Sequence, residues 1–387
     1  MNWSTYILFC YFLLGIQCKT IPFINNAILV PIRPKLNTTL LTNISCDQCL
    51  CSALQNSLIL AINCYANSTC ELFTQYPRTY QYQSSSNSRV YFPQSILPNA
   101  SNPCCMSNTT LLLQKLQNAA NPMINVTITQ PRCLLIDNNG SLVTIEQTAN
   151  GQSYFDRLDP RTLTLLEHIP INATVANIGH YQDKFYIGIN NNHTISVFKK
   201  GQTNNSLVYL TNINGGATPM KGVRDIIFLN NGSTMVVASA DNNCIYYYAV
   251  VNDTYYPLIT YTTVNYYTPH GLFPLNDSFY YVAAWSIPSI YSYKYNTQSA
   301  NWTQSLFATA PAPNTYGAHV FVDDCDRRWF TVYGYGIRIY DANGASLGSW
   351  SIGGGYFDAL LLDNYVLILS NSANSKLTRI DPQVTCD

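Results

Sequence analysis

Apolar runs that end in an Asp or Asn turn recur at nearly equal spacing through the last two thirds of the 387-residue chain. The turn residues are Asp137, Asp183, Asn230, Asn276, Asp323 and Asp363. They are separated by 46, 47, 46, 47 and 40 residues. A fixed period of about 40–50 residues is typical of four-stranded propeller blades. The pattern predicts a mainly β protein with a β-propeller over residues 121–387.

Each period divides into four short stretches with strand character. The unit around Asn230 predicts strands at residues 224–229, 234–239, 244–250 and 256–262, and the next unit at 270–275, 279–285, 289–295 and 302–308. Strands of about five to seven residues, joined by Asn, Asp and Gly turns, are what an antiparallel blade needs.

The last unit is one strand short. Residues 366–369 and 376–380 supply its second and third strands, and the sequence then stops at Asp387. Residues 124–129 have strand character and precede the first blade. We expect them to form the outer strand of the last blade, because a ring closed by a strand from the other end has no exposed sheet edge there. Six blades follow from this closure, with five as the alternative.

The same closure predicts a disulfide. The first and third strands of a blade run parallel, which places Cys386 near the start of the closing strand. We therefore expect Cys386 to pair with Cys104 or Cys105, which directly precede that region. In the chain-entropy view, a bridge across so long a loop stabilises the fold by about 4–5 kcal/mol.

The first 18 residues have the character of a secretory signal peptide. Residues 6–16 form an uncharged apolar core, although no Lys or Arg precedes it. A retained membrane anchor is the alternative, but the stretch is short for a bilayer and no later segment is long and apolar enough to span one. We expect a secreted, extracellular protein without a membrane span after removal of the leader, in which residues 19–45 are a spacer.

Charge is scarce along the whole chain. Charged residues make up 10% of the sequence and the formal net charge is zero. This balance argues against nucleic acid and anionic membranes as partners, since both attract clustered Lys and Arg. Glycans are the expected solubilising groups, because fourteen Asn-x-Ser/Thr acceptors follow the leader. They are Asn37, Asn43, Asn67, Asn99, Asn108, Asn125, Asn139, Asn172, Asn192, Asn204, Asn231, Asn252, Asn276 and Asn301.

Cysteines crowd into the region before the propeller. Eight lie between residues 46 and 133, which in a secreted chain indicates a disulfide framework. The alternative is a metal site at Cys46, Cys49, Cys64 and Cys70, but the second close pair of a zinc finger is missing. Eleven cysteines remain after the leader, an odd number, and Cys244 at the start of an apolar strand is the expected buried free thiol.

Residues 46–120 are expected to form a small disulfide-rich α+β module. A short helix over 46–57 and a second helix over 107–119, with Leu111, Leu112 and Leu116 at helical spacing, belong to it. The order Cys46-x-x-Cys49, Asn63-Cys64-Tyr65 and Cys70-x-Leu72-Phe73 resembles the core of PAN/apple domains. The resemblance implies a helix stapled to a small sheet, in a module that binds protein or carbohydrate.

The propeller also resembles a family. Thr268-Pro269-His270-Gly271-Leu272 is similar to the start of NHL repeats. Residues 154–160 and 376–382 resemble the third strand of NHL repeats and of six-bladed SMP-30-like propellers. The combination of leader, apple-like module and propeller resembles uncharacterised secreted propeller proteins of invertebrates.

Polar side chains near the start of each first strand are candidates for a site at the mouth of the central channel. They are Asn177, Arg224, Asp225, His270, His319 and Asp358. Two His and two Asp around one axis can bind a metal or transfer protons. Their distances from the turn residues differ, however, and neighbouring strand residues face opposite ways, so not all six can point inward. The alternative is that they only solvate the channel mouth.

Other catalytic signals are absent from the sequence. Lactonase-like propellers hold calcium with a Glu together with Asn and Asp, whereas the propeller region has only Glu146 and Glu167, neither at a first-strand start. There is no Gly-x-Ser-x-Gly elbow, phosphate loop or His-Glu-x-x-His. We expect no cofactor, with calcium as the candidate if one is present.

Tyrosine is abundant, at 30 residues. Tyr291, Tyr293 and Tyr295 share one face of a strand and form a candidate aromatic surface for sugars or a protein partner; packing between blades is the alternative. The sequence thus favours a secreted, glycosylated binding or scaffold protein without catalysis, whose partner is an extracellular protein or glycan. The alternative is a metal-dependent secreted propeller hydrolase or lactonase with its site at the channel mouth.

Overall fold

The computed structural model describes residues 3–8, 19–31, 38–54, 59–73, 80–93, 105–120, 123–138, 140–190, 192–201, 206–215, 219–262, 268–310, 314–362 and 365–384. The chain separates into two compact units, Met1–Pro103 and Cys104–Asp387. Each unit has its own hydrophobic core.

A six-stranded sheet and one helix make up the N-terminal unit. The strand order is β1 (Trp3–Leu8), β2 (Lys19–Pro31), β6 (Tyr80–Tyr91), β4 (Ala61–Tyr65), β5 (Thr69–Phe73) and β3 (Thr38–Thr42), beside α1 (Cys46–Leu54). Residues 19–45, expected as a spacer, instead contain β2 and β3, both paired into the sheet. β1 lies within the predicted leader, whose removal stays a prediction.

Two disulfides fasten helix α1 to this sheet. Cys46 is bonded to Cys64 on β4, and Cys49 is bonded to Cys70 on β5. The metal interpretation of these four cysteines is therefore wrong. The helix begins with a capping box, since Ser45 and Gln48 exchange side-chain-to-backbone hydrogen bonds of 3.1 and 3.2 Å. A helix stapled to a small sheet is the arrangement that the resemblance to PAN/apple domains implied.

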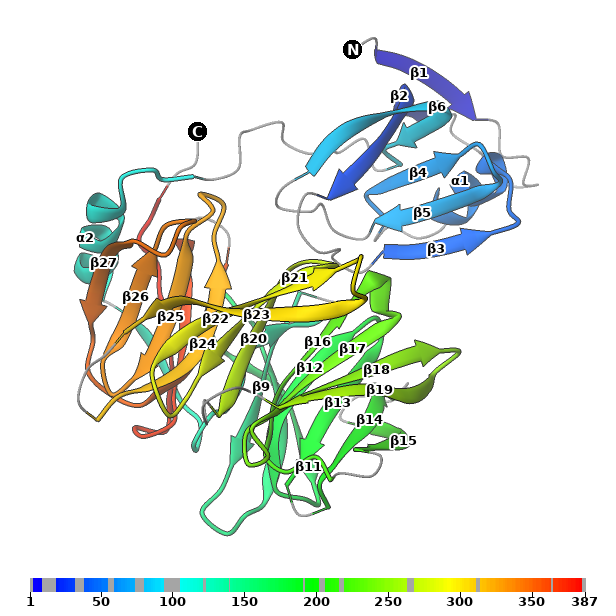
Figure 1. Ribbon diagram of the computed structural model, residues 1–387. Coiled ribbons are helices and arrows are strands. Elements are labelled where there is room, and N and C mark those ends of the chain that lie inside the picture. Colours follow the sequence, from blue (N-terminus) through cyan, green and yellow to red (C-terminus); the bar gives the residue numbers. More distant parts are fainter. Residues whose placement is uncertain are drawn as a thin grey trace. The chain divides into compact units, whose positions relative to one another are not determined.

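The second unit is a β-propeller built from four-stranded antiparallel sheets (Figure 1). The first three described sheets contain β8 (Leu135–Ile136), β9 (Leu142–Gln147), β10 (Ser153–Leu158) and β11 (Leu165–Ile171); β12 (Val175–Tyr181), β13 (Lys184–Ile189), β14 (Thr194–Lys200) and β15 (Leu207–Asn214); and β16 (Val223–Leu229), β17 (Thr234–Ser239), β18 (Cys244–Val251) and β19 (Thr254–Thr262). We number these sheets as blades 1 to 3.

Blades 4 to 6 continue the same pattern. They contain β20 (Pro269–Asn276), β21 (Phe279–Ala284), β22 (Ser289–Asn296) and β23 (Asn301–Thr309); β24 (Tyr316–Val322), β25 (Arg328–Tyr333), β26 (Gly336–Tyr340) and β27 (Ser346–Ser351); and β28 (Tyr356–Leu361), β29 (Leu367–Asn371) and β30 (Lys376–Ile380) with β7 (Ile124–Thr127). Six such sheets in the described residues are compatible with the six predicted blades.

Strand β7 closes the last sheet, as the sequence predicted. It pairs antiparallel with β30, with Val126 opposite Leu377 and Asn125 opposite Thr378. The Thr378 hydroxyl also donates a 2.7 Å hydrogen bond to Oδ1 of Asn125. This contact joins residues 253 positions apart and so ties the beginning of the unit to its end.

Tyrosines fill the space between blades 3 and 4. Tyr291 and Tyr293 are 6% and 3% exposed and belong to a core that includes Tyr247 of blade 3. Tyr293 stacks on Tyr280 with ring centroids 5.0 Å apart, and the ring centroids of Tyr295 and Trp302 are 5.3 Å apart. The predicted aromatic surface is therefore wrong at Tyr291 and Tyr293, which are buried against the neighbouring blade, while Tyr295 is half-buried.

Helix α2 (Thr109–Ala119) belongs to the propeller unit and not to the cysteine-rich module. Asn108 caps it by accepting a 3.0 Å hydrogen bond from the Leu111 amide. Leu112 and Leu116 are fully buried in a core with Trp329 of blade 5, and the helix lies against β27 (Figure 1). The predicted boundary near residue 120 thus moves to about residue 104.

Cys105, just before α2, is bonded to Cys325 in the turn between β24 and β25. This corrects the expected pairing of Cys105 with Cys386. The physical reason is helix α2, whose 11 residues extend about 16 Å and separate Cys105 from the start of β7. The other predicted partner, Cys104, lies outside the described residues, as does Cys386.

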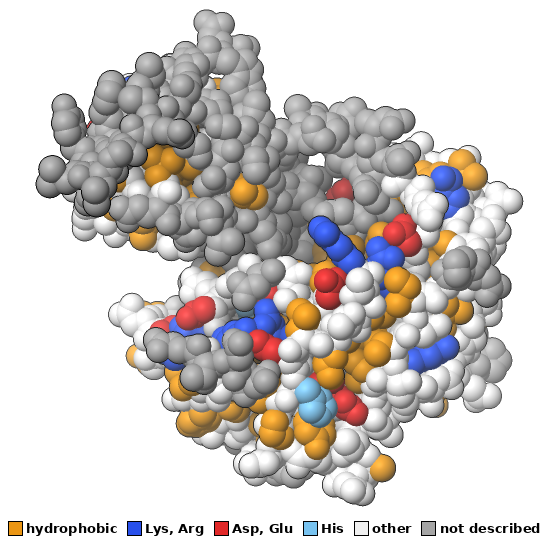
Figure 2. Space-filling view, turned by 180° about the vertical axis from the view of Figure 1, so that it is seen from behind, with side chains coloured by type: hydrophobic (Ala, Val, Ile, Leu, Met, Phe, Trp, Pro, Cys, Tyr) orange, Lys and Arg blue, Asp and Glu red, His pale blue; other side chains and the backbone are white. Residues whose placement is uncertain are grey.

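Charged side chains are sparse on the face shown in Figure 2, in keeping with the composition. Within the described ranges, no helix has the length and apolar character needed to cross a membrane.

Cys244 is buried at the start of β18, where its thiol donates a hydrogen bond to the carbonyl oxygen of Asn242 at 3.1 Å.

Candidate functional site at the channel mouth

A β-bulge near the start of the innermost strand recurs from blade to blade. The pairing register with the second strand shifts between Val175 and Asn177, Val223 and Asp225, Pro269 and Leu272, Gly317 and His319, and Tyr356 and Asp358. A bulge inserts an extra residue and re-aims the side chains beside it. The position after the bulge is therefore Asn177, Asp225, His319 and Asp358 in blades 2, 3, 5 and 6, whereas in blade 4 the bulge contains both His270 and Gly271.

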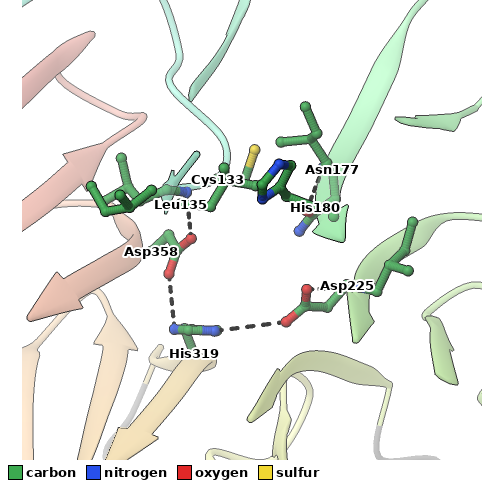
Figure 3. A pocket seen from close by; sticks show the side chains of 12 residues that line it. Cys133, Leu135, Asn177, His180, Asp225, His319 and Asp358 are labelled. Carbon is green, nitrogen blue, oxygen red and sulfur yellow. Dashed lines mark hydrogen bonds and ion pairs between the residues drawn. The ribbon is translucent and has the colours of Figure 1, made fainter. Parts of the chain in front are cut away.

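These post-bulge side chains converge on one cavity of about 190 Å³ in the channel (Figure 3). Asn177, Asp225, His319 and Asp358 all line it, so the structure brings together four of the six predicted site residues. Cys133 of blade 1 lines it as well. From the sequence, Cys133 was expected among the framework cysteines and not at this site. The signal that could have found it is its spacing, because it precedes the turn residue Asp137 by the same four residues that separate His319 from Asp323.

The two aspartates bridge neighbouring blades. Asp225 accepts hydrogen bonds from the Ile226 amide at 2.7 Å and from the Leu272 amide of blade 4 at 2.6 Å. Asp358 does the same with the Ala359 amide and the Leu134 amide of blade 1, both at 2.7 Å. Carboxylates that accept backbone hydrogen bonds from two blades fix the spacing of the innermost strands.

His319 lies between these two carboxylates (Figure 3). Its Nδ1 is 2.9 Å from Oδ1 of Asp358, and its Nε2 is 3.7 Å from Oδ2 of Asp225. Burial alone lowers the pKa of His319, but the two carboxylates outweigh it and raise the pKa to about 9. Burial also raises the pKa of Asp225 to about 6, against the opposing charge of His319. At neutral pH, His319 is thus an imidazolium ion paired within the channel.

Cys133 is a neutral thiol in this setting. Burial and the nearby charge of Asp358 raise its pKa well above the ordinary value, while the backbone of Ile178 and Ile145 partly opposes the shift. The thiolate is the nucleophilic form of cysteine, so this residue is not poised for attack. A protonated His319 likewise cannot accept a proton as a general base.

A metal ion in this cavity would have to compete with His319. Asp225, Asp358 and the amide of Asn177 offer oxygen ligands of the kind that calcium prefers. The imidazolium already occupies the space between the carboxylates, and the Asn177 amide donates to the carbonyl oxygen of Arg224. The residues present therefore suit an internal ion cluster better than a calcium site.

The other two predicted residues, Arg224 and His270, lie outside the cavity lining because they occupy the bulge itself. His270 is 4% exposed, its Nδ1 is 2.8 Å from the carbonyl oxygen of Ala318, and burial and the charge of Arg224 lower its pKa. Arg132 lies close by, with its guanidinium 4.9 Å from the ring centre of Phe357. Burial and the charge of Arg224 lower the pKa of Arg132, and burial lowers that of Arg224.

No carboxylate lies within ion-pair distance of either arginine among the described residues. Arg132 donates to Oε1 of Gln147 at 2.6 and 3.0 Å, a neutral acceptor. The negative charge of Asp241 raises the pKa of Arg224 against the effect of burial, but Asp241 lies beyond ion-pair distance. Two partly desolvated guanidinium groups without counter-ions are costly unless an anion joins them.

An aromatic group adjoins the arginines. Trp285 stacks on His270 and on Tyr316, with ring centroids 4.7 and 5.0 Å apart, and it also approaches Phe357 at 5.5 Å. Tyr316 is 38% exposed, so part of this group reaches solvent. We call Arg132, Arg224, Trp285, Tyr316 and Phe357 the mouth cluster.

Comparison with known proteins establishes the fold alone. No protein-family profile and no curated protein matches the chain. A solved luciferin-regenerating enzyme gives a TM-score of 0.51 at 12% identity, over 66% of this chain and 92% of its own. A putative 6-phosphogluconolactonase of Bacteroides fragilis gives 0.51 at 13% identity, over 67% and 85%. The periplasmic gluconolactonase of Pseudomonas aeruginosa gives 0.51 at 12% identity, over 66% and 82%. The chain is similar to these β-propellers in architecture.

Proposed function

We propose that this protein is a secreted, non-catalytic binding protein that takes an acidic saccharide at the channel mouth. The observation that carries the proposal is the pair of arginines, Arg132 and Arg224, which lack a carboxylate partner in the described structure and adjoin an aromatic group. Guanidinium groups bind carboxylates and sulfates with charge-assisted hydrogen bonds.

The aromatic members of the mouth cluster would contact the sugar ring of the ligand. Trp285 and Tyr316 are stacked with an interplanar angle of 15°, and Tyr316 is partly exposed. An aromatic face buries the apolar face of a pyranose ring at little entropic cost. Arginine beside aromatic rings therefore matches a ligand with both an anionic group and an apolar ring face.

The proposed compartment and absence of catalysis rest on separate observations. Three disulfides among the described cysteines favour an oxidising environment. Fourteen glycosylation acceptors follow a leader-like segment. In the cavity, His319 is protonated and Cys133 is a neutral thiol, so neither is poised as a general base or a nucleophile, which supports binding over hydrolysis. The neutral imidazole in the cavity lining is His180, whose pKa burial lowers to about 4.

Titration calorimetry of the full chain with an oligosaccharide of alternating glucuronic acid and N-acetylglucosamine tests the proposal. The uncharged oligomer of N-acetylglucosamine is the comparison ligand. Arg224→Gln should weaken binding of the acidic ligand at least tenfold, and Trp285→Ala should weaken it similarly. Arg161→Gln is the matched control, because Arg161 is an exposed arginine of blade 1 outside the mouth cluster.

Added salt should weaken binding in the wild-type protein and less so in Arg224→Gln, since screening acts on the ionic part of the interaction. Equal affinity for the acidic and uncharged ligands, or an unchanged affinity in Arg224→Gln, would contradict the proposal.

A further inference from the structure

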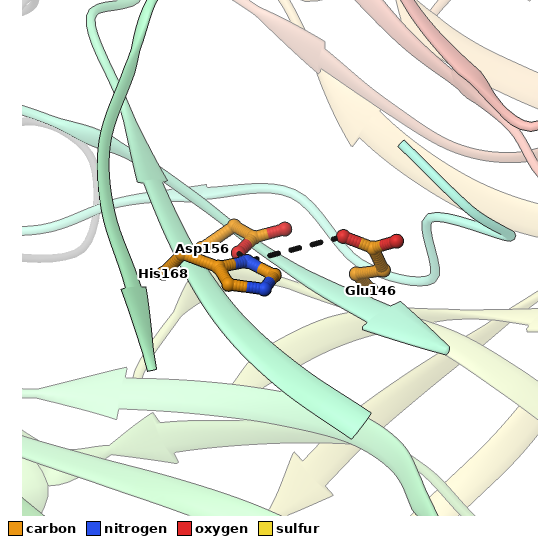
Figure 4. A group of neighbouring side chains, drawn as sticks. All are labelled: Glu146, Asp156 and His168. Carbon is orange, nitrogen blue, oxygen red and sulfur yellow. Dashed lines mark hydrogen bonds and ion pairs between the residues drawn. The ribbon is translucent and has the colours of Figure 1, made fainter. Parts of the chain in front are cut away.

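A second group of chemically active side chains lies in blade 1, apart from the channel. Glu146 on β9, Asp156 on β10 and His168 on β11 face one another (Figure 4). Strand register brings them together: Asp156 is directly opposite His168 on one side and Thr144 on the other, and Glu146 follows Thr144 by two residues. All four side chains therefore lie on the same face of the sheet.

The three ligand atoms of this group lie within 4.8 Å of one another. Nδ1 of His168 is 2.6 Å from Oδ1 of Asp156 and 4.0 Å from Oε2 of Glu146. The imidazole is held in this orientation by Tyr154, whose ring stacks on it with centroids 4.1 Å apart and an interplanar angle of 14°. One ring nitrogen is thus directed at two carboxylates.

Two further observations indicate a missing ligand at this place. Thr144 is fully buried, and its hydroxyl oxygen has no hydrogen-bond partner among the described residues although it lies directly across from Asp156. No ion pair in the described part of the chain brings a Lys or Arg to Glu146 or Asp156. Two close carboxylates, one of them 1% exposed, thus have only a half-exposed histidine as a cationic partner.

We propose that Glu146, Asp156 and His168 form a zinc site. Zinc takes imidazole nitrogen at about 2.0–2.1 Å and carboxylate oxygen at about 2.0–2.2 Å, often from three protein ligands with a fourth position open to water. An imidazole among carboxylates distinguishes the site from the all-oxygen sets that calcium and magnesium prefer.

Binding at this site requires only local movement. The ion replaces the hydrogen that joins His168 Nδ1 to Asp156, and that proton leaves to solvent if the nitrogen carries it. His168 has a side chain that is 42% exposed, so the ion can reach the group from solvent without opening the blade. The unpartnered Thr144 hydroxyl can bind the ion's water or a carboxylate that turns toward the metal.

The test is titration calorimetry of chelator-treated full-length protein with zinc chloride, together with the visible spectrum of the cobalt-loaded protein. Wild-type protein should bind one zinc ion at this site, and cobalt should give the absorption of a low-coordinate nitrogen and oxygen site. His168→Ala and Glu146→Gln should each weaken this binding at least tenfold and remove the cobalt bands. Both residues are at least partly exposed, so these variants should keep the fold.

His193→Asn is the matched control, because His193 lies in the turn before β14 and outside the group, in a positive-φ conformation that Asn tolerates. It should leave zinc binding unchanged. Absence of zinc binding, equal binding in His168→Ala and wild type, loss of binding in His193→Asn, or tighter binding of calcium than of zinc would each overturn the proposal. Arg224→Gln should bind zinc normally, which separates this site from the mouth cluster.

Discussion

The imidazole of His319 in blade 5 occupies the space that a side chain on Gly271 in blade 4 would need. A Cβ placed on Gly271 would lie 2.5 Å from Cδ2 of His319 and 2.8 Å from the carbonyl oxygen of Ala318. Because Gly271 in the bulge of blade 4 has no side chain, His319 reaches past it to within 3.7 Å of Asp225 in blade 3. A missing side chain in one blade thus permits an ion cluster that joins blades 3, 5 and 6.

Gly271→Ala should displace His319 and destabilise the propeller. Overpacking a tight contact costs about 1–3 kcal/mol, and here the neighbours include backbone atoms. Urea denaturation gives the loss in free energy of unfolding, and the imidazole NMR signals report the displacement of His319. Gly140→Ala is the control for the NMR signals alone, since a Cβ there meets nothing within 4 Å but the φ of +76° strains alanine; it should leave the His319 signals unchanged. Unchanged His319 signals in Gly271→Ala would contradict the packing argument.

Stability should fall as pH rises from about 6.5 to 9. The folded-state pKa of His319 is about 9, against 6.5 for the unfolded chain. The folded protein therefore binds the extra proton, and this stabilisation is complete below pH 6.5 and lost as pH rises through 9. At about 1.4 kcal/mol per pKa unit, the loss amounts to at most about 3.5 kcal/mol. Urea denaturation at a series of pH values measures it.

His319→Gln should flatten that dependence above pH 6.5. Asp225, whose pKa is raised to about 6 from 3.8, acts at lower pH and in the same direction, because its folded form holds a proton that the unfolded form has released. Asp225 should therefore lower wild-type stability between about pH 4 and 6 relative to Asp225→Asn, in which this part is removed. The lowered pKa of His270 acts in the opposite direction below pH 6.5, because the folded form binds fewer protons there, so the difference between the two proteins isolates the Asp225 contribution. Equal slopes in wild type and His319→Gln between pH 6.5 and 9 would exclude His319 as the titrating group.

Substitution of Arg327 should lower the free energy of unfolding of the propeller unit more than most substitutions do. Its buried guanidinium pairs with Asp323 at 2.7 Å and donates to the Met106 carbonyl oxygen at 2.7 Å and to the Tyr365 hydroxyl at 2.9 Å. Arg327→Met removes the ion pair that this guanidinium makes with Asp323, whose side chain is 2% exposed. Breaking a buried pair in this way costs about 3–5 kcal/mol, which chemical denaturation can measure.

Arg338→Met serves as a comparison for Arg327, because Arg338 is a half-buried arginine of the same blade that forms no ion pair within the described residues. Its guanidinium lies over the ring of Tyr335. Arg338→Met should lower the free energy of unfolding by at most about 1 kcal/mol. A similar loss in the two variants would show that the ion pair and its hydrogen bonds add nothing beyond packing.

Removing the Cys105–Cys325 disulfide should destabilise the propeller by about 2–5 kcal/mol, since it joins residues 220 positions apart. The double variant Cys105→Ala/Cys325→Ala tests this by thermal unfolding of non-reduced protein. Cys46→Ala/Cys64→Ala is the control, because that bridge lies within the N-terminal unit. An unchanged propeller transition in the first variant would show that the disulfide does not constrain the unfolded chain as expected.

Which residues lie at the channel site could be predicted from the sequence, but which of their side chains point into the channel could not. The sequence predicted Asn177, Asp225, His319 and Asp358 among six candidates, but the unequal distances from the turn residues suggested only that not all six could point inward. The β-bulges resolve this conflict, because each bulge adds a residue and resets which side chains point into the channel. A bulge depends on pairing with the neighbouring strand and leaves no clear local signal.

The sequence by itself determined the repeat of four-stranded units and the closing strand, predicted at residues 124–129 and formed by residues 124–127, because alternation and turn residues are local properties of the chain. Only the tertiary structure decided that Cys105 pairs with Cys325, that Tyr291 and Tyr293 are buried between blades, and that Glu146 and His168 meet at Asp156. These relations depend on how separate strands and blades pack, and a one-residue difference in register would move each side chain to the opposite face.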